Sequence, residues 1–270
     1  MTGAGELTNR VAIVTGAGRG IGYAIATAFA EAGARVIIGE LVPERGLQAA
    51  ERLRQLGHQA EAYQLDVRNS TSCQQLMSRV VADHGRIDSV VNNAGVAVYG
   101  KAEDMAEADW RLQIDVMLTG TFLVTQAAGR FMIPKGGGSI VNIASVGGMG
   151  GWPLRSAYNA AKAGIINLTE GLATEWAQYN IRVNCVSPGS TLTEMAEEAV
   201  RAGVARLETY ANRTPLRRLA EVHEIARAVL FLASDRSSFV TGVNLRVDGG
   251  WVAWGNPSGQ GFPVRNGANA

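Results

Sequence analysis

Cysteine is scarce in this chain, which has only Cys73 and Cys185 among its 270 residues. Two cysteines in a chain of this length suggest no disulfide framework and favour a reducing compartment. A dominant charge of one sign is also lacking, because the formal net charge is +1 and charged residues make up 18% of the chain. We therefore expect no nucleic acid or other polyelectrolyte partner.

Long apolar segments are absent from the sequence as well. The first ten residues, MTGAGELTNR, contain no apolar segment typical of a signal peptide. No continuous apolar run approaches the roughly 18 residues that a membrane-spanning helix needs. These features predict a soluble, cytoplasmic globular protein without a membrane partner.

Short apolar, β-branched runs alternate with helical stretches along the chain. We predict strands at 10–15, 35–40, 61–67, 87–91, 139–144, 181–189 and 243–247. We predict helices between them, the first ending at Gly33 and the others covering 43–56, 70–84, 104–132, 156–179, 192–212 and 221–233. This alternation is typical of an α/β fold of the Rossmann type, with a doubly wound parallel sheet of about seven strands and helices on both faces. Residues 1–254 then form one domain, and the tail 255–270 is either disordered or packed on a neighbouring subunit.

A tyrosine and a lysine four residues apart form a catalytic candidate. Tyr158 and Lys162 project from the same face of the predicted helix 156–179. A lysine this close favours the phenolate and lowers the pKa of a phenol from its reference of about 10. Ser145 follows the predicted strand 139–144, where its hydroxyl can hydrogen-bond a substrate oxygen. Together the three side chains form a site for moving a proton on and off an alcohol.

A glycine-rich segment lies between the first predicted strand and the first predicted helix. Gly16, Gly20 and Gly22, with Arg19 and Ile21 among them, let backbone N–H groups approach a pyrophosphate at a helix N-terminus. The alternative is a tight turn that needs glycine for its backbone angles. The strand–turn–helix context favours the dinucleotide site.

The end of the second predicted strand, at Glu40 and Leu41, is expected to select the cofactor. A carboxylate at Glu40 accepts hydrogen bonds from the adenosine ribose and repels a 2′-phosphate, which favours NAD over NADP. Arg19 is the counter-signal, because a guanidinium pairs with phosphate. The alternative for Glu40 is an ordinary solvated charge at a strand end.

Seven motifs in order resemble the short-chain dehydrogenase/reductase family over roughly residues 8–252. They are TGAGRGIG (15–22), LDV (65–67), NNAG (92–95), Ser145, YNAAK (158–162), PGSTLT (188–193) and VDGG (247–250). The resemblance implies hydride transfer between an alcohol and a nicotinamide cofactor, in which Tyr158 is the acid/base and Ser145 binds the same hydroxyl. Lys162 stabilises the phenolate and also binds the nicotinamide ribose in this interpretation.

The resemblance also implies further cofactor contacts, a homotetramer (or a dimer), and no metal. Two long helices, 104–132 and 156–179, would pack across a two-fold axis. The NNAG and VDGG motifs have a structural alternative as strand-end turns and subunit packing. The implied cofactor residues are Asp66 and Val67 at the adenine, Asn93, Ala94 and Gly95 at the adenosine ribose, and Pro188, Gly189, Thr191 and Thr193 at the nicotinamide.

One residue departs from the family pattern. Met117 stands where the family usually has an asparagine that anchors a water in a proton relay from the lysine to solvent. A thioether is only a weak acceptor and no donor. The relay must then run through other groups, such as backbone carbonyls and water, or proton exchange is slower. A weakly active nucleotide-binding member is the alternative that this departure leaves open.

The loop after Ser145 is expected to form the substrate site. Gly147 and Trp152 lie in this loop, where Trp152 could wall an apolar pocket, and Arg155 could pair with a substrate carboxylate or with a residue at a subunit interface. The segment 192–212 is polar and alanine-rich, which suits a mobile cover. The leading hypothesis is an NAD-dependent oxidation of a secondary alcohol, namely a sugar, polyol or sugar acid. The runner-up is an NAD(P)H-dependent reductase of a bulkier hydrophobic ketone.

Overall fold

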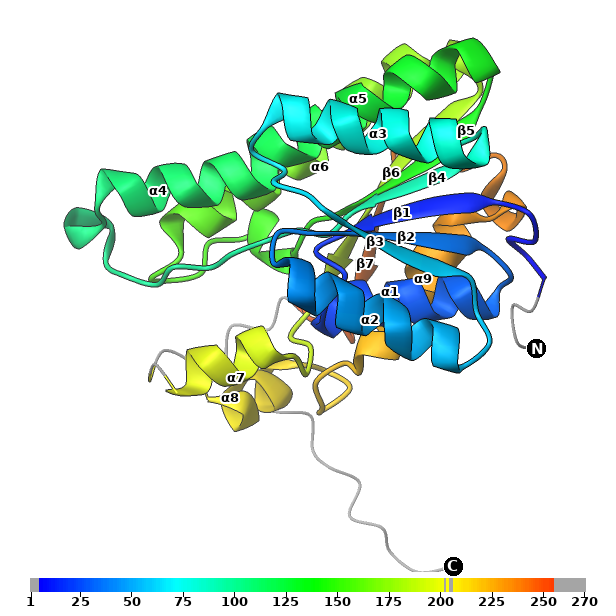
Figure 1. The fold of residues 1–270 in the computed structure, drawn as a ribbon. Helices are drawn as coiled ribbons and strands as arrows, with labels where there is room; N and C mark the ends of the chain where they lie inside the picture. Colours follow the sequence, from blue (N-terminus) through cyan, green and yellow to red (C-terminus); the bar gives the residue numbers. More distant parts are fainter. Residues whose placement is uncertain (1–4, 202, 204–205, 255–270) are drawn as a thin grey trace, which may run out of the picture.

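Seven parallel strands form the centre of the computed structural model, which describes residues 5–201, 203 and 206–254 (Figure 1). Their order across the sheet is β3-β2-β1-β4-β5-β6-β7, and all six neighbouring pairs are parallel. The predicted doubly wound sheet is therefore confirmed. The strands are β1 (Val11–Thr15), β2 (Arg35–Glu40), β3 (Ala60–Gln64), β4 (Ser89–Asn92), β5 (Gly138–Ile143), β6 (Ile181–Pro188) and β7 (Asn244–Val247).

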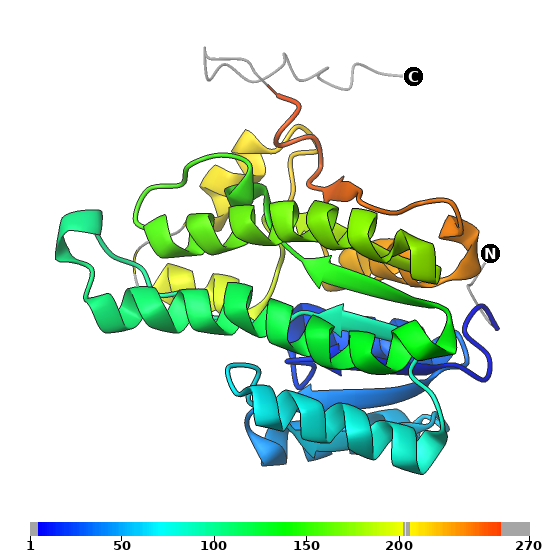
Figure 2. The same cartoon turned by 90° about the horizontal axis from the view of Figure 1, so that it is seen from above.

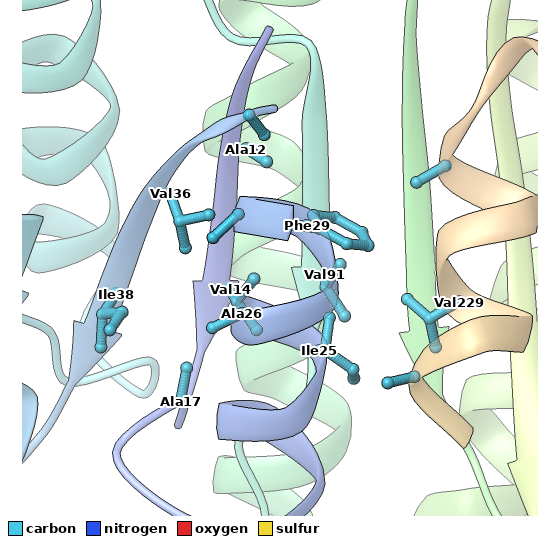
Figure 3. Packing of buried hydrophobic residues seen from close by; sticks show 14 of the residues in the cluster. Ala12, Val14, Ala17, Ile25, Ala26, Phe29, Val36, Ile38, Val91 and Val229 are labelled. Atoms are coloured by element: carbon cyan, nitrogen blue, oxygen red, sulfur yellow. The ribbon is translucent and has the colours of Figure 1, made fainter. Parts of the chain in front are cut away.

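Helices cover both faces of the sheet (Figures 1 and 2). One face carries α1 (Gly20–Glu31), α2 (Pro43–Gln55) and α9 (Val222–Ala233), and the other carries α3 (Ser70–His84), α5 (Gly120–Lys135) and α6 (Ser156–Trp176). Helices cover β1 on both faces, so all five of its residues are buried. This burial on both faces explains why the strand is mostly apolar instead of alternating between apolar and polar residues. Figure 3 shows the core under α1 and α9, to which Ile25, Phe29, Val36, Ile38 and Val229 contribute.

The long helix predicted at 104–132 has a different form. It runs from Glu107 to Lys135 as α4 (Glu107–Ile114), a π-helical turn (Asp115–Thr119) and α5. Gly136, at φ 78°, ends it in the left-handed conformation that glycine adopts at low cost. At the start of α5, the Thr121 hydroxyl donates a 2.6 Å hydrogen bond to the carbonyl oxygen of Met117 in the π turn. The apolar period of the sequence predicted the helix but not the extra residue in this turn.

The segment predicted as a helix over 192–212 consists of two shorter helices, α7 (Glu194–Arg201) and α8 (Leu207–Arg213). Gly203 lies between them at φ 73°, a conformation that does not continue an α-helix. The strand predicted at 61–67 also ends earlier, at Gln64, because Asp66 accepts a hydrogen bond from the Arg68 backbone and turns the chain. The predicted tail 255–270 lies outside the described residues.

Within the described part of the chain, one helix could cross a membrane by length and composition alone. It is the helix Glu107–Lys135, whose most apolar window has a mean hydropathy of 1.3. Half of that window is buried inside the protein, as in the core helix of a soluble protein. The observation is therefore weak support for a membrane location.

Candidate active site

A cavity of about 560 Å³ opens beyond the ends of β1, β4 and β5, where the strand order reverses. This is where open α/β sheets bind ligands, and the volume is in the range of cofactor sites. Ser145, Trp152 and Arg155 line the cavity, whereas Gly147 does not. All predicted cofactor residues line it as well: Gly16, Arg19, Gly20, Ile21, Gly22, Glu40, Leu41, Asp66, Val67, Asn93, Ala94, Gly95, Tyr158, Lys162, Pro188, Gly189, Thr191 and Thr193.

The loop from β1 to α1 leaves room only for backbone. A Cβ on Gly16, which has φ 62°, would lie 2.9 Å from the Ala94 Cα, and a Cβ on Gly22 would lie 2.5 Å from the Gly16 carbonyl oxygen. Gly20 begins α1, so the positive end of the helix dipole points into the cavity. This cradle of bare backbone fits the pyrophosphate of a dinucleotide.

Asn93 fastens this loop to the end of β4. Its side-chain amide donates to the carbonyl oxygens of Thr15 and Gly16 at 2.9 and 3.1 Å. The Thr15 hydroxyl accepts in return from the backbone N–H groups of Asn93 and Ala94 at 3.0 and 3.1 Å. The NNAG motif thus holds the phosphate loop, and its predicted contact with the adenosine ribose stays a prediction.

Glu40 is buried at 5% exposure rather than solvated, although it lines the cavity. Its carboxylate accepts hydrogen bonds from the backbone N–H groups of Gly18 and Val42 at 3.2 and 3.3 Å. Arg45 lies 3.6 Å from the same carboxylate and covers Gly18. Arg45 was missed at the sequence level, where no local pattern marks it. Its cation bears on the choice between NAD and NADP.

Asp66 and Arg68 form a cavity-lining pair at the predicted adenine end. The guanidinium of Arg68 donates to both carboxylate oxygens of Asp66, at 2.9 and 2.7 Å. This hydrogen bonding lowers the pKa of Asp66 and keeps the carboxylate ionised. The cavity therefore has a fixed polar wall here, next to the apolar Val67.

The structure brings Ser145, Tyr158 and Lys162 together at the other end of the cavity. Ser145 follows β5, and its hydroxyl oxygen accepts a 3.0 Å hydrogen bond from the backbone N–H of Gly147. Gly147 thus positions Ser145 from behind instead of contacting the cavity. Tyr158 and Lys162 lie on the first turns of α6, and the Lys162 Nζ is 5.6 Å from the centroid of the tyrosine ring.

Burial shifts both ionisable groups of this site. It raises the pKa of Tyr158 above 10.0, while a hydrogen bond with Ser145 and the positive charge of Arg155 act in the lowering direction. Burial also lowers the pKa of Lys162 to about 8. The expected net lowering of the tyrosine pKa by Lys162 is wrong for this structure. The ammonium group instead donates its 2.7 Å hydrogen bond to the Ile143 carbonyl oxygen.

Met117 is fully buried in the π turn, in an apolar cluster. Its thioether has no proton to donate, so a proton relay cannot run through this side chain. The ammonium group of Lys162 donates its hydrogen bond to the backbone carbonyl of Ile143. The Met117 side chain packs with Ala144, Ala161, Ile165 and Cys185.

The loop after β6 carries Thr191 and Thr193, which are predicted to contact the nicotinamide. The Thr191 hydroxyl donates to the Gly189 carbonyl oxygen at 3.0 Å, so it shapes the loop. The Thr193 hydroxyl oxygen accepts from the Ala196 backbone N–H at 3.2 Å and caps the start of α7. Thr193 keeps its own proton for another acceptor. Its predicted bond to a carboxamide stays a prediction, as does the contact with Pro188.

Helix α7 covers the phosphate loop with acidic side chains. Arg19, which we expected to pair with a phosphate, lies 3.0 Å from the Glu198 carboxylate. A Cβ placed on Gly20 would lie 3.2 Å from the Glu194 carboxylate. The predicted mobile cover thus lies directly over the loop that would hold the pyrophosphate.

Aromatic side chains surround Arg155 at the substrate end of the cavity. Trp152 was predicted there, whereas Tyr99 and Tyr210 were missed. Tyr210 comes from α8 and Tyr99 from the loop after β4, so only the folded chain brings them to Tyr158.

Comparison with known sequences finds relatives that are described as dehydrogenases or reductases. A family model described as enoyl-(acyl carrier protein) reductase matches residues 16–252. A cis-4-hydroxycyclohexanecarboxylate dehydrogenase from Sinomonas cyclohexanicum is 44% identical over 90% of this chain and 97% of its own length. A 3-oxoacyl-(acyl-carrier-protein) reductase from Thermotoga maritima is 42% identical over 92% and 99%. An NAD-dependent glycerol dehydrogenase from Listeria innocua is 38% identical over 92% and 95%.

Solved structures with the same fold are also similar in sequence. A short-chain type dehydrogenase/reductase from Mycobacterium marinum has a TM-score of 0.88 and 32% identity, over 94% of this chain and 98% of its own. A gluconate 5-dehydrogenase from Burkholderia cenocepacia, in complex with NADP and tartrate, has a TM-score of 0.88 and 36% identity over 94% and 98%.

Proposed function

The chain belongs to the short-chain dehydrogenase/reductase family, and we propose that it is an NAD-dependent dehydrogenase of secondary alcohols, with a sugar, polyol or sugar acid as substrate. The observation that carries this proposal is the meeting of Ser145, Tyr158 and Lys162 in the cavity into which the phosphate loop opens. This arrangement joins a proton acceptor for an alcohol to a cradle for a dinucleotide.

The chain's own residues handle the proton of the reaction. The Ser145 hydroxyl and the Tyr158 oxygen bind the substrate hydroxyl, and Tyr158 as phenolate takes its proton. In this proposal the Lys162 ammonium, 5.6 Å from the centroid of the Tyr158 ring, stabilises the phenolate and so works against the rise in the tyrosine pKa that burial causes. A nicotinamide cofactor, when bound, supplies the hydride acceptor. Gly16, Gly20 and Gly22 would hold its pyrophosphate.

The preference for NAD rests on Glu40. A buried carboxylate at the end of β2 disfavours a 2′-phosphate in its place. The glycerol dehydrogenase relative, described as NAD-dependent, agrees with this choice. Arg19, Arg45 and Arg68 in the same cavity argue for NADP, as does the NADP in the gluconate dehydrogenase structure. We give more weight to Glu40 because Arg45 and Arg68 each lie close to a carboxylate at that end of the cavity.

A reductase of a bulkier hydrophobic ketone is the second candidate. The rings of Trp152 and Tyr210 stack at the cavity wall with centroids 5.7 Å apart, which provides an apolar surface for such a substrate. One relative is described as a 3-oxoacyl-(acyl-carrier-protein) reductase, a name that denotes the reduction of a ketone.

For the assembly and location of the protein, we propose a homotetramer in the cytoplasm that has no nucleic acid partner, no membrane partner and no metal.

The test is a panel of secondary alcohols, polyols and sugar acids with NAD and with NADP, followed at the absorbance of the reduced nicotinamide. Wild type should reduce NAD with at least one alcohol, and Tyr158→Phe should lose at least 10²-fold in kcat. The phenylalanine variant should still bind NADH. Turnover that Tyr158→Phe leaves intact, or a strong preference for NADP, would contradict the respective part of the proposal.

A further inference from the structure

Arg155 is a cation in the wall of the active-site cavity, close to the reacting oxygen. It precedes α6 as the N-cap residue, three positions before Tyr158, and its charge acts on the pKa of that tyrosine. Among the residues that the structure describes, no aspartate or glutamate forms an ion pair with Arg155, whereas Arg86 and Arg218 have such partners. The positive charge of Arg155 is therefore not neutralised by this part of the chain.

Neutral aromatic groups hold the guanidinium in place. Its central carbon lies 4.7 Å from the Trp152 ring centroid, 5.0 Å from Tyr99 and 5.9 Å from Tyr210. One N–H donates a 2.9 Å hydrogen bond to the Tyr210 hydroxyl. A guanidinium has five N–H donors in a planar fork that matches a carboxylate. The described residues use one of them, which leaves the rest for a ligand.

The backbone before Arg155 is held in an unusual conformation. Leu154 has φ 63°, in the left-handed region that bulky residues rarely adopt. Its carbonyl oxygen accepts a 3.1 Å hydrogen bond from the Gly100 N–H, which ties the loop to the segment that carries Tyr99. Strain of this kind clusters at sites that position a ligand. In addition, a cation at a helix N-terminus adds to the positive end of the dipole, so this corner of the cavity favours an anion.

We propose that Arg155 binds a carboxylate of the substrate, so that, within the proposed substrate range, the enzyme acts on hydroxy acids or on the matching keto acids. The inference rests on the proposed dehydrogenase function of the same cavity and names its substrate class. The cavity also has apolar wall residues, among them Val96, Ala97, Met195 and Leu207, and polar ones such as Ser145 and Glu194. The Trp152 ring in the same wall provides a surface on which the ring of a cyclic hydroxy acid can pack.

The test compares 4-hydroxycyclohexanecarboxylate with its carboxamide, which has nearly the same shape but no charge. Wild type should oxidise the acid with a kcat/KM at least 10-fold above that of the amide. Arg155→Met should lower kcat/KM for the acid by about 10- to 100-fold and change the amide less than threefold. Arg155→Lys should recover only part of the loss, because a lysine lacks the planar fork. Turnover of the amide also shows that each variant is folded.

Arg213 provides a matched control. It lies over Trp251 at 4.7 Å, on the far side of the same aromatic cluster, and it lines a second cavity instead of the active site. Arg213→Met should leave the acid-to-amide ratio of kcat/KM unchanged. An equal loss on acid and amide in Arg155→Met would overturn the proposal, because Arg155 would then act through Tyr158 or through the fold. A wild-type enzyme that does not discriminate between acid and amide would overturn it too.

A binding measurement separates this inference from the dehydrogenase proposal. Cyclohexanecarboxylate, which has no hydroxyl to oxidise, should quench the tryptophan fluorescence of the NADH complex, with a dissociation constant at least 10-fold higher in Arg155→Met. Binding with this dependence but no alcohol turnover would uphold the carboxylate site and reject the dehydrogenase. Alcohol turnover without such binding would reject the carboxylate site alone.

Discussion

At the scale of single residues, burial controls the chemistry of the candidate site. Lys162 is only 5% exposed, and its ammonium donates a hydrogen bond to the neutral carbonyl oxygen of Ile143. Burial lowers its pKa to about 8, against about 10.4 for a lysine in an unfolded chain. The folded protein therefore carries this charge at a cost that the unfolded chain does not have.

We predict that Lys162→Met stabilises the protein at neutral pH while abolishing activity. Between pH 8 and 10.4 the unfolded chain binds more protons than the folded one, so the wild-type free energy of unfolding rises with pH in this window. Below pH 8 the full cost of the buried charge is present. The variant should therefore gain about 1–3 kcal/mol at pH 7, and the gain should vanish near pH 10.4. Urea unfolding of both proteins at pH 7, 9 and 10.5 measures the difference.

Lys101→Met is the matched control, because Lys101 is exposed. Its free energy of unfolding should follow that of the wild type at all three pH values. A gain in Lys162→Met that does not depend on pH would mean that packing, and not charge burial, separates the two proteins.

The sequence predicted the members of the site better than their interactions. Their spacing in the sequence predicts Ser145, Tyr158 and Lys162, and in the structure all three line one cavity. The direction of the tyrosine pKa depends on burial by elements far apart in the chain, which spacing does not contain. The sequence did not identify Tyr99, Tyr210 and Arg45 as residues of the site for the same reason. Their positions follow from the loops and helices that fold over the sheet, and no local pattern marks them.

At the scale of elements, α7 lies over the loop that would hold the pyrophosphate of a dinucleotide. Its Glu198 pairs with Arg19 at 3.0 Å, and Glu194 faces Gly20 at the start of α1. The positive end of the α1 dipole favours an anion at this position, and a carboxylate of α7 already lies there. Its charge would lie beside the pyrophosphate in the proposed complex, where like charges repel.

We predict that the double variant Glu194→Gln, Glu198→Gln binds NADH two- to fivefold more tightly than wild type. The expected range is small because the Arg19–Glu198 pair is close to half exposed, and exposed ion pairs contribute about 0–1 kcal/mol. Titration of NADH fluorescence measures the dissociation constant. The difference should shrink at 0.5 M salt, since salt screens exposed charges.

Glu197→Gln serves as the control on the same helix. Glu197 is exposed, and its partner Arg201 lies 3.9 Å away on α7 itself. This variant should bind NADH as the wild type does. Weaker binding by the double variant would mean that these carboxylates help to hold the cofactor, and unchanged binding would mean that they do not act on it; either result contradicts the prediction.

The sequence predicted which segments are helices and which are strands, but it did not predict where a helix is interrupted. Apolar periodicity predicted a helix through Met117, but a π turn keeps the hydrophobic face while it adds one residue. The gap between α7 and α8 had a local sign in Gly203. Alanine-rich sequence on both sides of that glycine favours helix, which is why one long helix was predicted.

At the scale of the whole molecule, the helix Glu107–Lys135 has more apolar surface than its own chain covers. Trp110 and Phe122 are 40% and 39% exposed on it. Each large aromatic side chain that becomes buried removes substantial apolar surface from water. The proposed homotetramer would cover these side chains with a second copy, and a membrane is the competing explanation because the helix is long and apolar enough.

We predict that Phe122→Glu dissociates the proposed tetramer. Without detergent, light scattering after size-exclusion chromatography should give wild type about four times the 28.5 kDa chain mass. A carboxylate placed in an apolar interface has no partner, so the variant should elute as dimer or monomer with an unchanged circular dichroism spectrum. Leu47→Glu, at a 56% exposed position of α2 on the other face of the sheet, should keep the wild-type mass. A monomeric wild type, or one that sediments with lipid vesicles through this helix, would reject the interface, because the exposed aromatics would then have another cover.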